Sequence, residues 1–144
     1  IVNSNNGNIE NSKMIKIENQ FAIIMDCNIS SNIEKIEDEL NSFKDLKISY
    51  KKIQHSNFSK KTITTYLMKG ADDQGIINTI SEYFTKNNIN IIEVDTYIES
   101  APITGSPLFN MKITVEYIST ISKNHINKEI SKICKNLNLD IQML

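Results

Sequence analysis

The acidic turn GADDQG at residues 70–75 is the segment whose residue types and spacing best suit ligand chemistry. It separates a run of threonine and apolar residues from a run of apolar residues at helical spacing. Gly75 lets another backbone approach closely. At the start of a helix, the N–H groups of Gln74, Gly75 and Ile76 could hold a carboxylate. This turn is therefore the first candidate for an anion site.

The two carboxylates of this turn have two interpretations. Asp72 could accept hydrogen bonds from the ammonium group of a ligand. Alternatively, Asp72 and Asp73 cap the following helix and interact with its dipole, which requires no ligand. Both interpretations stay open on spacing alone.

The other reactive side chains form no catalytic or metal-binding pattern. His55 and His125 are distant in sequence and lack acidic neighbours at ligand spacing, so we interpret them as solvated surface residues and propose no metal site or cofactor. Cys27 and Cys134 lie in apolar segments and are interpreted as small buried apolar residues. Paired carboxylates, a nucleophile motif and a phosphate loop are all missing, which disfavours an enzyme.

Composition excludes several classes of protein. The 144 residues suffice for one ordinary domain or two small ones. Sixteen lysines, no arginine and 17 acids give a net charge of −1, which disfavours direct binding to nucleic acid. Apolar runs are much shorter than the ~20 residues of a membrane span, and no signal peptide opens the chain. We therefore expect a soluble cytoplasmic protein.

Hydrophobic periodicity predicts a βαββαβ order for the second half of the chain. Strands are predicted at 62–69, 90–99, 108–117 and 139–143, with helices from Ile76 to Asn87-Asn88 and over 126–137. This order is typical of the ferredoxin-like α+β fold, an antiparallel sheet with helices on one face. In the second strand Ile92, Val94, Thr96 and Ile98 share one face, and in the third the inward residues are Phe109, Met111, Ile113, Val115 and Tyr117.

The first half repeats most of this pattern. Strands are predicted at 8–17, 20–29 and 46–54. A helix carries Ile33, Ile36, Leu40 and Phe43 at helical spacing after a capping box of Ser31 and Glu34. Asn8 corresponds to Asn90, 82 positions later. We therefore expect two units, 1–57 and 62–144, of which the first lacks its first strand and most of its first helix. Residues 1–6 would be the end of that helix, and the chain would be incomplete at its N-terminus.

Several strings resemble a known family. The repeat of two units resembles tandem ACT domains, which are amino-acid-sensing regulatory modules. More narrowly, NIENSKM and QFAIIM in the first half, with GADDQGIINTI and APITGSPLFNM in the second, are similar to the glycine cleavage system transcriptional repressor family. The resemblance implies a regulator without catalysis that responds to glycine and restrains a LysR-type activator protein, without touching DNA.

The resemblance also implies where a ligand would bind. ACT domains usually hold an amino acid where the first strand's loop meets the first helix, at an interface with a neighbouring unit, so two units or a homodimer could complete the site. The implied ligand-binding residues are Asp72, Asp73, Gln74, Gly75, Ile76, Asn90 and Asn8. The family commonly has proline at the position of Gln74. Because this chain lacks that proline, its turn is less rigid. An alternative function is the regulatory ACT part of an amino-acid biosynthetic enzyme.

Overall fold

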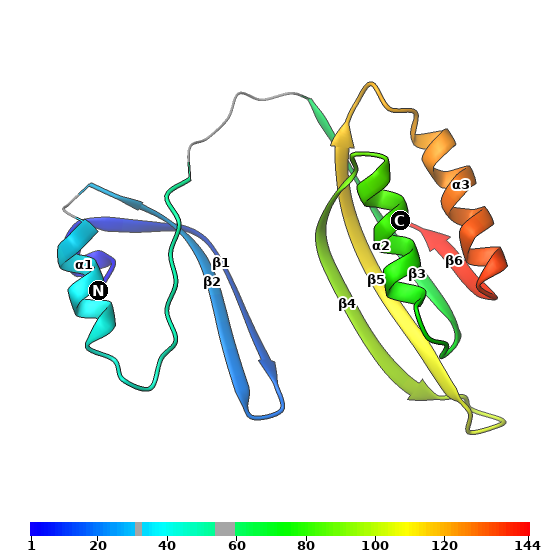
Figure 1. Ribbon diagram of the computed structural model, residues 1–144, viewed down its shortest axis with the longest axis horizontal. Coiled ribbons are helices and arrows are strands. Elements are labelled where there is room, and N and C mark those ends of the chain that lie inside the picture. The colour runs from blue at the N-terminus through cyan, green and yellow to red at the C-terminus, as the bar shows by residue number, and fades with distance from the viewer. Residues whose placement is uncertain (31–32, 54–59) are drawn as a thin grey trace. The chain divides into compact units, whose positions relative to one another are not determined.

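The computed structural model describes residues 1–30, 33–53 and 60–144 and separates into two compact units (Figure 1). Unit 1 covers Ile1–Gln54 and unit 2 covers His55–Leu144. Unit 1 contains η1 (Asn3–Asn5), β1 (Gly7–Ile17), β2 (Gln20–Ile29) and α1 (Ile33–Asn41). Unit 2 contains β3 (Lys61–Ala71), α2 (Ile76–Lys86), β4 (Asn90–Ser100), β5 (Pro107–Ile118), α3 (Lys123–Asn136) and β6 (Leu139–Met143).

Unit 2 has the predicted ferredoxin-like ACT-type fold. Its four strands form an antiparallel sheet in the order β4-β5-β3-β6. Both α2 and α3 lie on one face of this sheet (Figure 1). Asn87 caps the C-terminal end of α2 and Asn88 has a φ of 54°, as expected for residues that end a helix. The α+β prediction is confirmed.

The core of unit 2 lies between the sheet and its two helices. β5 contributes its inward residues as predicted, because alternate side chains of a strand point to one face. The buried apolar cluster comprises Tyr66, Met68, Ile76, Ile80, Phe84, Ile89, Phe109, Met111, Ile113, Val115, Tyr117, Ile126, Ile130, Cys134 and Leu139. Tyr66 is buried, which raises the pKa of its hydroxyl, and that hydroxyl donates to Asn127 Oδ1 at 2.8 Å.

The outer strand β4 departs from the predicted burial. A β-bulge at Ile92 shifts its register against β5, so that Ile91 and not Ile92 packs against the core. Beyond the bulge, Val94 and Ile98 lie opposite the buried residues of β5 but remain exposed. β4 is at the edge of the sheet, with a neighbouring strand of unit 2 on one side only among the described residues. The alternating pattern predicted the strand correctly but overestimated its burial.

Unit 1 repeats the hairpin of unit 2 in detail. β1 pairs with β2 and carries a bulge at Glu10, which is 82 positions before the bulge at Ile92. Next to the bulge, Ile9 faces Cys27 just as Ile91 faces Val115. The internal repeat that the sequence indicates is therefore present in the strand pairing.

The predicted closing strand of unit 1 is wrong for the residues that the structure describes. Residues 46–53 form no strand, and Gln54 lies outside the described residues. In unit 2 the closing strand β6 pairs only with β3. The described part of unit 1 has no strand equivalent to β3, so residues 46–53 lack the hydrogen-bonding partner that a closing strand needs.

Three further predictions concern the length of α1, its capping box and His55. Phe43 lies beyond the end of α1 and is exposed, so the helix is shorter than predicted. The capping box falls on Ser31, which lies outside the described residues. The same is true of His55.

Candidate functional site

The α2 turn, which we define as residues 72–75, has a backbone set by glycine. Gly75 is the N-cap of α2 with a φ of 84°, and no side chain caps the helix. The Gly75 carbonyl accepts the first helical bond, from the Thr79 N–H at 2.9 Å. The interpretation of Asp72 and Asp73 as caps of α2 is therefore wrong. Glycine occupies that position because the left-handed conformation strains other residues.

One of the three N–H groups predicted to hold a carboxylate is already engaged. The Gln74 N–H donates to Asp73 Oδ1 at 2.7 Å. This bond folds the Asp73 carboxylate back onto its own turn. A ligand would instead meet the N–H groups at the beginning of α2, where the helix dipole also favours an anion.

A cavity of about 490 Å³ lies beside this turn and the first turns of α2. Four of the predicted site residues line it, namely Asp72, Asp73, Gly75 and Ile76. Gln74 does not line it. Four lining residues were missed by the sequence analysis, namely Ile77, Asn78, Ser81 and Phe109. Helical spacing could have indicated Asn78 and Ser81, which are three residues apart and share a helix face.

Asn90 lies at the opposite end of the sheet. The strand pairing places Ala71, next to the turn, opposite Leu108, whereas Asn90 lies opposite Glu116. The eight residue-to-residue steps from Leu108 to Glu116 span about 26 Å of strand. Asp72 and Asn90 of unit 2 therefore cannot contact the same small ligand.

Asn90 instead belongs to a polar cluster on the sheet. Its Nδ2 donates to Glu116 Oε1 at 2.9 Å, and Lys61 Nζ lies 2.9 Å from the same oxygen. These two bonds hold the pKa of the Glu116 carboxyl below its usual value, with Lys61 the larger cause. Asn8, the equivalent of Asn90 in unit 1, pairs with Asn28 across the hairpin. Neither asparagine lines the cavity beside α2.

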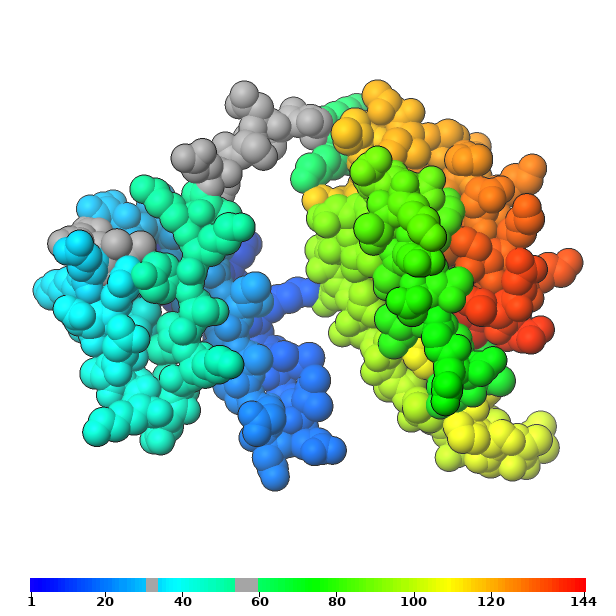
Figure 2. All heavy atoms as spheres, viewed as in Figure 1, coloured from blue at the N-terminus to red at the C-terminus, as the bar shows by residue number. Residues whose placement is uncertain are grey.

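Exposed apolar side chains surround the end of unit 2 that carries the α2 turn. The 101–106 loop connects β4 to β5 at this end, because Ser100 lies opposite Pro107. At its tip, Ile103 is 97% exposed. Ile77 on α2 and Ile98 on β4 are exposed as well. In Figure 2, α2 in green lies uncovered beside β4 in yellow-green.

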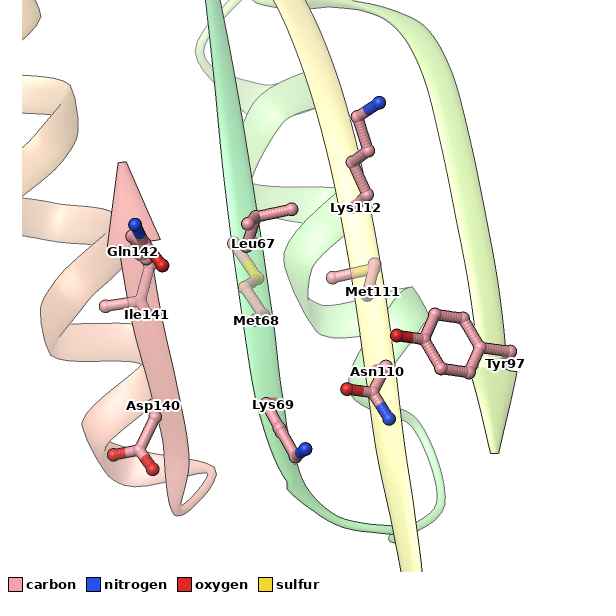
Figure 3. A pocket seen from close by; sticks show the side chains of 10 residues that line it. All are labelled: Leu67, Met68, Lys69, Tyr97, Asn110, Met111, Lys112, Asp140, Ile141 and Gln142. Carbon is pink, nitrogen blue, oxygen red and sulfur yellow. The ribbon is translucent and has the colours of Figure 1, made fainter. Parts of the chain in front are cut away.

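A second hollow, of about 360 Å³, lies on the sheet face without helices (Figure 3). Lys69, Lys112, Tyr97, Asn110 and Asp140 are among its lining residues. Lys69 Nζ lies 2.5 Å from Glu99 Oε1, and this bond lowers the pKa of Glu99 and raises that of Lys69. The Lys69 charge is thus already neutralised by a carboxylate. The α2 turn is therefore a better candidate site for an anionic ligand than this hollow.

The remaining reactive side chains lie where no site is formed. Within residues 1–30, 33–53 and 60–144, no three histidine, cysteine or acidic side chains are grouped to hold a metal ion, and no helix is long and apolar enough to cross a membrane. His125 is exposed near the start of α3. Cys134 is buried and Cys27 only partly so. Burial therefore agrees with the sequence interpretation for Cys134 more fully than for Cys27.

Comparison with known proteins bears on the fold. The sequence matches no family model and no curated protein. Among solved structures, an unknown protein from Galdieria sulphuraria matches with a TM-score of 0.85 and 22% identity over 99% of this chain and 84% of its own. A protein described as a candidate glycine cleavage system transcriptional repressor matches with a TM-score of 0.71 and 18% identity, over 99% of this chain and 83% of its own. These similarities show a common fold.

Proposed function

We propose that this chain is an amino-acid-responsive regulatory protein that acts by contact with a transcriptional activator. The cavity beside α2 carries the proposal, because it combines a helix start that no side chain caps with two carboxylates. An α-amino acid has one carboxylate and one ammonium group. The helix N–H groups would bind the carboxylate, and Asp72 or Asp73 would bind the ammonium group.

Glycine is the proposed ligand. This follows from the sequence resemblance to the repressor family, and the fold shared with a candidate member of that family supports it. Ile76, Ile77 and Phe109 supply the apolar part of the cavity lining. The proposed role is regulatory and not catalytic.

The proposed partner is an activator protein of the LysR type. Ile77, Ile98 and Ile103 are exposed around the end of unit 2 that carries the cavity. Clustered exposed apolar residues are typical of protein contact surfaces. A ligand that orders the α2 turn would change the affinity of this surface for its partner, which is the thermodynamic requirement for a regulatory response.

A ligand shared between two sheets is a specific version of this proposal. The outer edge of β4 has no strand partner among the described residues of unit 2. Pairing of two such edges would bring together residues from two sheets and would make a homodimer. Light scattering after size exclusion tests the homodimer directly.

The test of the ligand is thermal unfolding of the protein with glycine, serine, acetate or methylamine at millimolar concentration. A ligand at 100 times its dissociation constant stabilises the folded state by about 2.7 kcal/mol, which gives a clear shift in the midpoint. We expect a shift with glycine and none with acetate or methylamine, which each carry one of its two charges. Asp72→Ala should abolish the shift and Asp95→Ala, a control outside the cavity, should retain it.

Two outcomes separate the versions of the proposal. Loss of the glycine shift in Asn90→Ala would show that the ligand lies between two sheets, because Asn90 cannot reach the cavity of its own unit. No shift with any amino acid would overturn the sensor proposal. Capture of a LysR-type regulator on the immobilised protein, compared with and without glycine, then tests the partner.

A further inference from the structure

Residues 93–100 of β4, which we call the β4 edge, form an open side of the sheet of unit 2. They pair with β5 without interruption, from Glu93 opposite Thr114 to Ser100 opposite Pro107. On their other side, no strand of the described part of the chain pairs with them (Figure 1). Backbone N–H and C=O groups along such an edge have no ladder partner within the sheet. The β4 edge can therefore accept one more strand.

The side chains of the β4 edge restrict the chemistry of that strand. Asp95, Tyr97 and Glu99 share the sheet face without helices, because they alternate with Val94 and Ile98, which lie opposite core residues of β5. Val94 is 38% exposed and Ile98 is 60% exposed. The whole of β4 contains three acids and no lysine. The β4 edge therefore has one acidic face and one apolar face.

Residues 46–53 have the complementary pattern and form no strand in unit 1. Apolar and polar residues alternate at the beginning of this segment, in the order Leu46, Lys47, Ile48, Ser49, Tyr50 and Lys51. The three apolar side chains of this series are exposed. The segment contains three lysines and no acid, so its charge is opposite to that of β4. Its alternation is that of a strand, which needs only a neighbour to supply hydrogen bonds.

The spacing of the charges matches in both possible strand directions. Lys47 and Lys51 are four residues apart, and so are Asp95 and Glu99. One register therefore brings both lysines opposite both acids, whether the strands run parallel or antiparallel. The same register brings the apolar residues of the segment to the apolar face of the β4 edge. Glu99 is already bonded to Lys69, so Asp95 is the acid that gains most from a new lysine.

We propose that residues 46–53 of a second copy of this chain add a strand to the β4 edge. Main-chain hydrogen bonds supply the affinity, and the alternating side chains set the register. Exchange of this strand in both directions closes a two-fold dimer. A second β4 is a less suitable occupant, because it would bring three more acids to an edge that is already acidic. The inference does not depend on the proposed ligand.

The first experiment follows the mass and the hydrogen exchange of the chain over a wide range of protein concentrations. We expect light scattering to show a dimer. As the dimer forms, amide exchange should slow at least about tenfold both in the β4 edge and in residues 46–53. Slower exchange in the β4 edge alone would show that two β4 edges pair, which would overturn the assignment of the strand. A monomer at every concentration, or protection that is independent of concentration, would overturn the role of a second copy.

Charge reversal tests the pairing of the side chains. Asp95→Lys places like charges opposite each other and should raise the dissociation constant of the dimer at least about tenfold. Asp140→Lys is the matched control, because it makes the same change of charge on β6, at the other edge of the sheet. Amide exchange in β3 reports whether each variant has folded. Equal weakening of the dimer by the two variants would overturn the proposed contact.

A second reversal should restore the dimer and gives the direction of the added strand. In the Asp95→Lys background, Lys47→Glu restores the affinity if the strands are parallel, and Lys51→Glu restores it if they are antiparallel. Rescue by neither variant would overturn the register. Asp95 does not line the cavity beside α2, so Asp95→Lys should keep the effect of glycine on thermal unfolding. The dimer proposal and the ligand proposal can therefore fail separately.

Discussion

Units 1 and 2 share a hairpin with the same register, the same bulge position and the same apolar pattern, but only one of them has buried that pattern. Phe109 of β5 is 6% exposed, whereas Phe21, at the same position of β2, is 63% exposed. The difference lies in β3 and α2, which unit 2 places against β5. An alternating strand thus becomes part of a core only when another layer covers it.

The largest expected difference between the units is in cysteine reactivity. Cys134 is fully buried, and burial raises its pKa to about 11. Cys27 lies partly exposed on β2, with a pKa raised mainly by burial and also by Asp26. Cys134 needs unit 2 to open, and an opening free energy of about 5 kcal/mol slows its reaction by about 4 × 10³-fold. A thiol reagent at pH 8, with Cys27→Ser and Cys134→Ser to assign the signals, measures the ratio. Equal reaction rates of the two thiols would contradict the burial of Cys134 in unit 2.

The second prediction compares the two equivalent phenylalanines. Phe109→Ala removes a buried ring and should destabilise unit 2 by about 3–4 kcal/mol. Phe21→Ala changes an exposed side chain and should change stability by less than about 0.5 kcal/mol. Denaturant unfolding, followed through the exchange of amides in β3 for unit 2 and in β1 for unit 1, measures both. Similar losses would mean that Phe21 is buried in solution.

The third prediction weakens the contact that closes the sheet of unit 2. A Cβ on Gly70 would lie 2.6 Å from the Asn138 carbonyl oxygen and 2.8 Å from Leu139 Cδ2. Gly70→Ala should therefore destabilise the pairing of β3 with β6 by about 1–3 kcal/mol. β6 would then resemble residues 46–53, which pair with no strand in the described part of unit 1. Faster amide exchange in β6 is the expected signal.

Gly105→Ala is the control for that substitution. No atom lies near the added Cβ, but the φ of 69° strains alanine by about 1 kcal/mol. Its effect should be confined to the 101–106 loop. If both variants accelerate exchange in β6 equally, the close contact at Gly70 is not what sets the pairing.

The smallest expected effect concerns acid. The bonds from Lys61 and Asn90 lower the pKa of Glu116 in the folded chain. Its contribution to stability is therefore present above the ordinary carboxyl pKa and is lost as the pH falls through the lower, folded-state pKa. Glu116→Gln should flatten this part of the stability curve of unit 2. Unit 1 has the uncharged pair Asn8 and Asn28 at the equivalent positions and should lack this component. An unchanged curve in Glu116→Gln would remove Glu116 as its cause.

The α2 turn was predictable in part. Local sequence indicates Gly75 as the start of α2, because glycine is favoured where the backbone is left-handed. Asp72, Asp73 and Ile76 line the same cavity because they are neighbours in the chain, so local sequence also places them together. Phe109 joins them only through the pairing of β5 with β3. Asn90 lies at the other end of the sheet, and its distance from the turn depends on strand direction, which residue spacing does not give.

The sequence by itself determined the order of helices and strands and the internal repeat. Periods of 2.0 and 3.6 residues are local properties of the chain, and so are the glycine and asparagine residues that end its elements. Only the tertiary structure decided burial and pairing. Val94 and Ile98 stay exposed because β4 lies at an edge, and residues 46–53 form no strand because a strand needs hydrogen bonds from a neighbour distant in sequence.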